Sequence, residues 1–320
     1  MIWIMLFHMG FGIPVLSYFI GLGYLGVDVF IFLSAYGLYH GYNGKNLNYI
    51  AFYKKRCLRI LPAYYIVMFI FFGIDCLMGK DVSFLSLLEK MSMLGFFLPF
   101  LRWNFFLWYI PAILFLYLFF PLMIKYLSQI KQKRNFILIF LSLLSINIIL
   151  TYFIYNYGYN KYSLLLLIPR IFVFMIGLIW ADIETKYIAK FLSEKSMLFA
   201  IGLMCIVFLF IWLVKILLPY YIQHLFMLEI LPFLFALPGF FICCVLLFQK
   251  LHPICQNIVL FAGTYSLELY LLHEYLYKNA VSLANYIHLP VIFILLGIFI
   301  VCFPLAYGLH KAVNKLLFLR

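Results

Sequence analysis

Charged residues are scarce in this chain, and acidic residues are the scarcest. Asp, Glu, Lys and Arg together make up 10% of the 320 residues, with 10 acidic against 23 basic side chains and a net charge of +13. Hydrophobic residues account for 68%, and the mean hydropathy is +1.12. Soluble domains have only about 45–50% apolar residues. The composition therefore excludes a soluble globular domain and predicts a polytopic membrane protein.

Ordered cysteine patterns are also lacking. Seven Cys are scattered through the chain, and they show neither metal-ligand spacing nor a disulfide framework. We interpret them as small buried hydrophobic residues and predict no metal site. Internal repeats and matched pairs of broken helices, which are typical of many transporters, are missing from the sequence as well.

Apolar runs between polar breaks predict an all-α integral membrane protein with about ten transmembrane helices and no soluble domain. The predicted spans are residues 1–14, 23–41, 60–78, 105–127, 136–156, 164–181, 197–218, 227–248, 259–278 and 290–309. The first span rises only about 20 Å, whereas the hydrocarbon core is about 30 Å thick. We therefore expect a single membrane domain over residues 1–320 whose natural N-terminus lies further upstream.

The distribution of Lys and Arg orients these spans. One set of loops and ends carries 16 basic residues, and the opposite set carries 5. Because basic loops stay in the cytoplasm, both termini are expected to be cytoplasmic. Attraction to anionic lipid explains the positive charge, so that no nucleic-acid partner is expected.

Polar side chains gather in the outer half of the predicted spans. The residues concerned are His8, Asp28, Arg170, Ser266, Tyr270 and His273. The last three follow an i, i+4, i+7 spacing and would line one stripe of a helix. A lone histidine in a membrane helix is more often structural than catalytic. Ionisable groups are costly in hydrocarbon, however, and a cluster of them indicates a functional site. The pattern predicts an outward polar cavity.

Two arginines mark the cytoplasmic mouth of the third span. Arg56 and Arg59 are three residues apart and share one face if that helix begins early. They are either ordinary cytoplasmic anchors or a clamp for phosphates, since the guanidinium fork matches phosphate oxygens.

Six segments in a fixed order resemble the acyltransferase-3 family of integral membrane acyltransferases. They are His8 closing the first span, GVDVFIFLSAYGL (26–38), FYKKRCLRILPAYY (52–65), LWYIPAILFLYLFFPL (107–122), RIFVFMIGLI (170–179) and YSLELYLLH (265–273). Each match alone is weak, whereas the ordered set is specific and covers almost the whole chain.

The resemblance implies transfer of an acyl group, usually acetyl, from cytoplasmic acyl-CoA to a sugar hydroxyl of a cell-envelope polysaccharide or lipid-linked glycan. It implies that His8 is catalytic and that Arg56 and Arg59 bind the donor. His8 would act as general base on the hydroxyl, and a covalent acyl-histidine relay stays open as a second mechanism.

The remaining matched residues would line the acceptor cavity or support it. They are Asp28, Ser34, Tyr36, Trp108, Arg170, Ser266, Tyr270 and His273. Acyl-CoA is expected as co-substrate rather than as a bound cofactor. The expected location is the bacterial cytoplasmic membrane, and the oligomeric state is left open.

Two departures from the family pattern stand out. The family has an Arg about ten residues before the first histidine, and position 8 leaves no room for it, which again suggests a shortened start. The family's Ser-Gly-Phe is here Ser34-Ala35-Tyr36, a change that keeps the sizes similar. The esterase-like soluble domain of longer members is not expected here.

Other classes of protein compete with this interpretation. A transporter or flippase for a lipid-linked glycan would share the outward cavity and the basic inner loops. A glycosyltransferase or polymerase usually carries a large loop rich in carboxylates or arginines, whereas the longest outer loop, 79–104, holds few. In a non-enzymatic interaction protein, His8 would be replaceable without loss of activity.

Overall fold

The computed structural model describes residues 1–9, 14–42, 48–98, 107–129, 145–146, 148–149, 162–191, 194–217, 227–287 and 291–318. Within these residues every element is helical, which confirms the all-α prediction. The predicted span 136–156 lies almost entirely outside the described residues.

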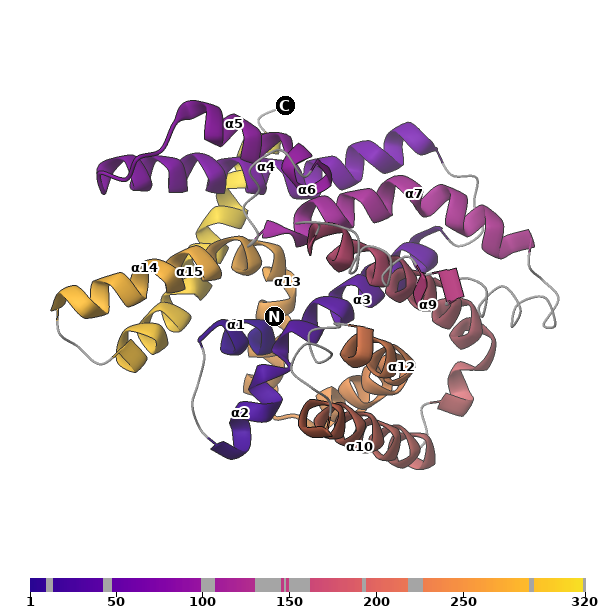
Figure 1. Ribbon diagram of the computed structural model, residues 1–320. Helices are drawn as coiled ribbons and strands as arrows, with labels where there is room; N and C mark the ends of the chain where they lie inside the picture. Colours follow the sequence, from indigo (N-terminus) through magenta and orange to yellow (C-terminus); the bar gives the residue numbers. More distant parts are fainter. Residues whose placement is uncertain are drawn as a thin grey trace. The chain divides into compact units, whose positions relative to one another are not determined.

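The chain divides into two compact units, whose α-helices are labelled in Figure 1. Unit 1 comprises Met1–Gly26, Ile50–Leu114 and Pro253–Arg320, and unit 2 comprises Val27–Tyr49 and Phe115–His252. Unit 1 contains almost all residues of the helices α1 (Ile2–Met9), α2 (Pro14–Gly21), η1 (Gly23–Leu25), α4 (Tyr49–Leu77), α5 (Phe84–Ser92), α6 (Leu94–Phe97), α13 (Pro253–Thr264), α14 (Ser266–Ile287) and α15 (Val291–Phe318). Unit 2 contains the helices α3 (Gly26–Tyr42), α9 (Tyr162–Phe191), α10 (Glu194–Leu217) and α12 (Met227–Lys250). Helix α7 (Tyr109–Gln129) contributes to both units.

Helices of membrane length are present among these elements. Four described helices are long and apolar enough to cross a bilayer, namely Tyr49–Leu77, Tyr109–Leu127, Leu166–Glu184 and Ile292–Leu317. They agree with four of the predicted spans and with a membrane protein. The count of ten spans and the cytoplasmic termini stay predictions.

Helix α4 begins earlier than the predicted span 60–78. It starts at Tyr49 and therefore includes the basic segment before the apolar run. This early start meets the condition set for Arg56 and Arg59, which now lie on one helix three residues apart and share a face.

The predicted span 259–278 is not one helix. Helix α13 ends at Thr264 and α14 begins at Ser266, with a turn at Tyr265 between them. The Thr264 hydroxyl donates to the carbonyl of Leu260, 2.8 Å away. Such a back-bond to the preceding turn bends a helix, and apolar periodicity does not reveal it.

In unit 2, α3 and α9 approach each other closely at Gly177. A Cβ at this position would lie 2.5 Å from the carbonyl oxygen of Phe32 and 2.8 Å from the Cβ of Ala35. No side chain larger than hydrogen fits there without moving the backbone of α3. This close packing allows Asp28 of α3 to reach Arg170 of α9.

Candidate active site

Helix α1 is seated tightly in unit 1, and this seating places His8. A Cβ on Gly23 would lie 2.5 Å from the carbonyl oxygen of Trp3, and one on Gly26 would lie 2.8 Å from the Ile4 side chain. The indole of Trp3 also donates to the carbonyl of Phe19 at 2.8 Å. The two glycines therefore let α1 pack against the segment that follows it, which fixes the direction of the helix that ends beside His8.

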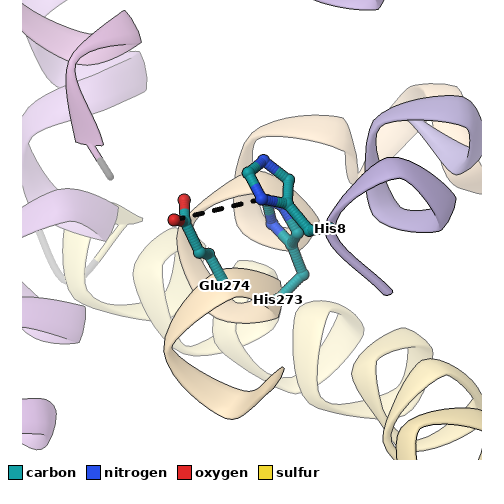
Figure 2. Close-up of side chains that lie close together, drawn as sticks. All are labelled: His8, His273 and Glu274. Carbon is teal, nitrogen blue, oxygen red and sulfur yellow. Dashed lines mark ion pairs between the residues drawn. The ribbon is translucent and has the colours of Figure 1, made fainter. Parts of the chain in front are cut away.

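His8 faces a histidine and a glutamate of α14 (Figure 2). Its Nδ1 atom lies 4.0 Å from Oε1 of Glu274, and its ring centroid lies 5.1 Å from that of His273. The His8 side chain is 29% exposed and that of Glu274 13%, whereas His273 is fully buried. His8 is thus the accessible member of a cluster of three titratable side chains.

The hydrogen bonds of His273 define its tautomer. Its Nδ1 lies 3.0 Å from the carbonyl of Leu269 and 2.9 Å from that of Tyr270. Because carbonyls only accept, Nδ1 carries a proton and donates. In the neutral ring Nε2 is then an acceptor, and this buried atom has no hydrogen-bond partner among the described residues. His273 therefore presents a lone pair inside the protein.

The cluster can assist proton transfer at His8. A distance of 4.0 Å is longer than a hydrogen bond, but catalytic contacts are often loose without substrate and tighten in the reacting complex. A carboxylate at this position would stabilise an imidazolium formed by proton transfer to His8.

The same three residue types also suit a transition metal. Their ligand atoms lie within 4.8 Å of one another, and two histidines with one carboxylate are typical zinc ligands. A metal on His8 would occupy the nitrogen that a general base needs, so the two uses exclude each other.

Tyr270 and its neighbours hold this part of α14 in place. Tyr270 is buried, and its hydroxyl accepts from the backbone N–H of Tyr109 at 3.3 Å. Ser266 is the first residue of α14, so the predicted stripe with Tyr270 and His273 does lie on a single helix. Trp108 directly precedes α7, where its carbonyl accepts from the N–H of Ala112. Roles for these residues in an acceptor cavity stay predictions.

The predicted donor-binding arginines lie on α4, and Arg59 contacts α14 at a different point from His8. Nη1 of Arg59 lies 3.6 Å from Oε1 of Glu268, and its Nη2 donates to the carbonyl of Thr264 at 3.3 Å. Glu268 precedes Glu274 by six residues on α14, which corresponds to a rise of about 9 Å. One helix therefore contacts both the histidine predicted to be catalytic and the arginine expected to bind the donor.

Arg56 lies one turn before Arg59 on α4. Its guanidinium lies 5.6 Å from the centre of the Phe52 ring, a cation–π distance. The phosphate-binding role of Arg56 stays a prediction.

In unit 2 the structure pairs Asp28 with Arg170. Nε of Arg170 lies 2.9 Å from Oδ1 of Asp28, and Nη2 lies 3.5 Å from Oδ2. The Arg170 side chain is 2% exposed and the Asp28 side chain 0%. Nη1 also donates to the carbonyl of Leu166 at 3.2 Å. A buried pair of this kind links α3 to α9, and a direct role in acceptor binding or carbonyl polarisation stays a prediction.

Two other predicted residues of unit 2 also lie in polar contacts. The hydroxyls of Ser34 and Tyr117 are 2.7 Å apart. The ring of Tyr36 lies 4.4 Å from that of His40, whose Nε2 is 3.9 Å from Oε2 of Glu184. Together with Asp28 and Arg170, these contacts form a series of polar links along α3.

Comparison with known protein families shows which kind of protein this is. The model of the acyltransferase domain that defines the acyltransferase-3 family matches residues 1–310. This chain belongs to that family. The match confirms the resemblance seen in the sequence and identifies a membrane acyltransferase. Searches among curated proteins and solved structures found no match to the acyltransferase.

Three residues of these clusters escaped the sequence analysis. Glu274 follows the matched histidine directly, but adjacent residues point in different directions on a helix, so its approach to His8 was not predictable. Glu268 falls off the Ser266–Tyr270–His273 stripe, and His310, whose Nδ1 lies 2.7 Å from Oε1 of Glu268, lies near the end of the last helix. Their acidic and imidazole side chains within apolar helices were the available signal.

Proposed function

We propose that this acyltransferase moves an acyl group, acetyl as the first candidate, from cytoplasmic acyl-CoA to a sugar hydroxyl of an envelope polysaccharide or lipid-linked glycan. The observation that carries the proposal is the accessible His8 beside Glu274 and His273. The family assignment supplies acyl transfer, and the proposal adds the donor, the acceptor and the base.

The reaction needs a base because a sugar hydroxyl is not ionised at neutral pH. In our proposal, a ring nitrogen of His8 takes the hydroxyl proton while the oxygen attacks the thioester carbonyl. The new C–O bond forms, the C–S bond breaks, and the proton passes from His8 to the departing thiolate. Glu274 stabilises the positive charge on His8 between these two steps.

The donor would be held by charge. The 3′-phosphate and pyrophosphate of CoA carry several negative charges, and Arg56 and Arg59 would bind them by charge-assisted hydrogen bonds. Binding at a distance from the thioester positions the reacting carbon and reduces the entropy lost in the transition state.

Transfer of radiolabel tests the proposal. Membranes containing the acyltransferase or its His8→Ala variant are incubated with labelled acetyl-CoA, and label is counted in the envelope glycan fraction. We expect label with the wild type and only background with the variant. If wild type and variant label the glycan equally, His8 is not the base, and if neither does so with any acyl-CoA, the proposed donor is wrong.

A chase experiment distinguishes direct transfer from a relay through an acyl-histidine. Direct transfer leaves no label on the protein when the acceptor is omitted. An intermediate on His8 would appear as protein-bound label that hydroxylamine removes and that the acceptor discharges.

A further inference from the structure

Arg59, Glu268 and His310 form a second cluster in unit 1, from α4, α14 and α15. Oε1 of Glu268 lies 2.7 Å from Nδ1 of His310 and 3.6 Å from Nη1 of Arg59. The Glu268 side chain is 1% exposed, His310 21% and Arg59 45%. A buried carboxylate thus lies beneath an arginine that reaches the surface.

The hydrogen bonds of this cluster have one consistent direction. A carboxylate only accepts, so Nδ1 of His310 donates to Glu268. Nδ1 of His310 and Nη1 of Arg59 are 3.4 Å apart, and both carry protons, so they converge on the same carboxylate rather than bond to each other. Glu268 therefore holds His310 by a hydrogen bond and Arg59 by an ion pair, from two different helices.

Burial makes this arrangement stiff. An ionised carboxylate out of water is costly unless it is paired and hydrogen-bonded, so Glu268 favours the conformation in which Arg59 and His310 are in place. Nη2 of Arg59 also donates to the carbonyl of Thr264, at the end of α13, where helix carbonyls lack partners within their helix. Contacts with Glu268 and Thr264 reduce the rotamer freedom that a long Arg side chain loses on binding a ligand.

Further basic side chains lie near Arg59 in the sequence of α4 and near His310 in the sequence of α15. Lys54 and Lys55 are exposed near the start of α4, and Lys311 and Lys315 are exposed near the end of α15. Arg59 contacts His310, the neighbour of Lys311, so the α4 and α15 segments meet at this cluster. A polyanion is the ligand that such a surface attracts.

We infer that Glu268 and His310 are positioning residues that hold the Arg59 guanidinium for the phosphates of the acyl donor. The inference rests on the proposed function, since it takes acyl-CoA as the donor, and it deepens that function by adding two residues that do not touch the donor themselves. Orientation of a guanidinium matters because its planar fork binds phosphate in one geometry.

Donor truncation tests the inference in the full chain reconstituted in lipid nanodiscs. Initial rates are measured with acetyl-CoA and with acetyl-pantetheine, which has the same thioester but no phosphate. We expect Glu268→Gln to raise KM for acetyl-CoA about tenfold with kcat nearly unchanged, because the amide still accepts a hydrogen bond but lacks the charge that holds the Arg59 guanidinium. With acetyl-pantetheine the variant and the wild type should have the same KM.

Conservative variants separate positioning from folding. His310→Asn keeps an N–H donor near the place of Nδ1 and should retain the KM of the wild type, whereas His310→Leu should behave as Glu268→Gln does. Glu89→Gln, on α5, is the matched control because it removes one carboxylate elsewhere in unit 1. If Glu268→Gln does not accumulate, the His310 pair still decides the question.

Each outcome has a distinct meaning. A fall in kcat without a change in KM, or the same loss with both donors, would overturn the positioning role and leave the proposed function intact. A wild type that uses acetyl-pantetheine as well as it uses acetyl-CoA would show that phosphates are not recognised, and the inference would fail. If the wild type transfers from no acyl-CoA at all, the proposed function fails first and takes this inference with it.

Discussion

His8 on α1 and Glu274 on α14 face each other across 4.0 Å, although 266 positions separate them in the sequence. The Glu274 side chain is 13% exposed and that of His8 29%, so the carboxylate is the more buried of the two groups. This order suits a histidine that receives a proton from a substrate and is stabilised by a carboxylate behind it.

Removal of the Glu274 charge should slow the reaction without weakening donor binding. We expect Glu274→Gln to lower kcat about tenfold or more with KM for acetyl-CoA unchanged. His8→Ala should lower kcat by about 10²–10⁴, the usual contribution of general acid–base catalysis. Steady-state kinetics in nanodiscs checks both values.

Two controls accompany this prediction. Added imidazole should restore part of the activity of His8→Ala, and Glu89→Gln should be neutral. A Glu274→Gln enzyme with wild-type kcat would show that the carboxylate has no part in the proton transfer.

Zinc should inhibit this acyltransferase, and chelation should not. His8, His273 and Glu274 offer ligand atoms within 4.8 Å of one another, so Zn²⁺ would compete with the proton for His8. We expect EDTA to leave the rate unchanged and added Zn²⁺ to lower it reversibly. Loss of activity on prolonged chelation, restored by zinc, would mean that the metal is required and would contradict the proposed role of His8.

A ligand variant locates the inhibitory zinc. His273→Gln removes one nitrogen ligand and should raise the inhibitory zinc concentration at least about tenfold, since loss of a residue that only supports a ligand already costs about 10–100-fold in affinity. Zinc bound per protein, measured by elemental analysis at saturating metal, checks this independently of activity.

The Asp28–Arg170 pair is expected to support folding. Removing one partner of a buried pair leaves an uncompensated charge and costs about 3–5 kcal/mol. Asp28→Asn should therefore lower the thermal stability of the detergent-solubilised protein markedly, whereas the double change Asp28→Leu with Arg170→Met should regain most of it. Light-scattering or fluorescence melting curves measure both.

Activity of the double variant then separates structure from acceptor binding. If the Asp28–Arg170 pair only joins α3 to α9, the stably folded double variant stays active. Restored stability without activity would instead assign Arg170 to the acceptor or the acyl carbonyl, as the sequence predicted.

Gly177 should tolerate no side chain. A Cβ there would lie 2.5 Å from the Phe32 carbonyl oxygen, which belongs to the backbone and cannot rotate away. We expect Gly177→Ala to destabilise unit 2 by about 1–3 kcal/mol through overpacking. Gly202→Ala on α10 is the control, since nothing lies within 4 Å of its added Cβ. It should be neutral or stabilising by up to about 1 kcal/mol. Equal melting temperatures for both variants would refute the close packing.

The sequence by itself determined the class of this protein and the family to which it belongs. Its apolar composition and membrane-length runs predicted helices in a bilayer, because hydrocarbon leaves a backbone few other ways to satisfy its polar groups. The ordered motifs predicted the family that the comparison then confirmed. His8, Arg56, Arg59 and His273 were predicted as site residues from residue type and depth, since a charged or titratable group in an apolar run is conspicuous.

Only the tertiary structure decided which of these groups have partners. Glu274 beside His8, Glu268 between Arg59 and His310, and Arg170 on Asp28 all join helices far apart in the sequence. The first two contacts depend on how α1, α4 and α15 pack against α14, and the third depends on how α3 packs against α9. Periodicity along one helix shows which residues share its face, but it does not show where the next helix lies. The position of that neighbouring helix decides which side chains face each other.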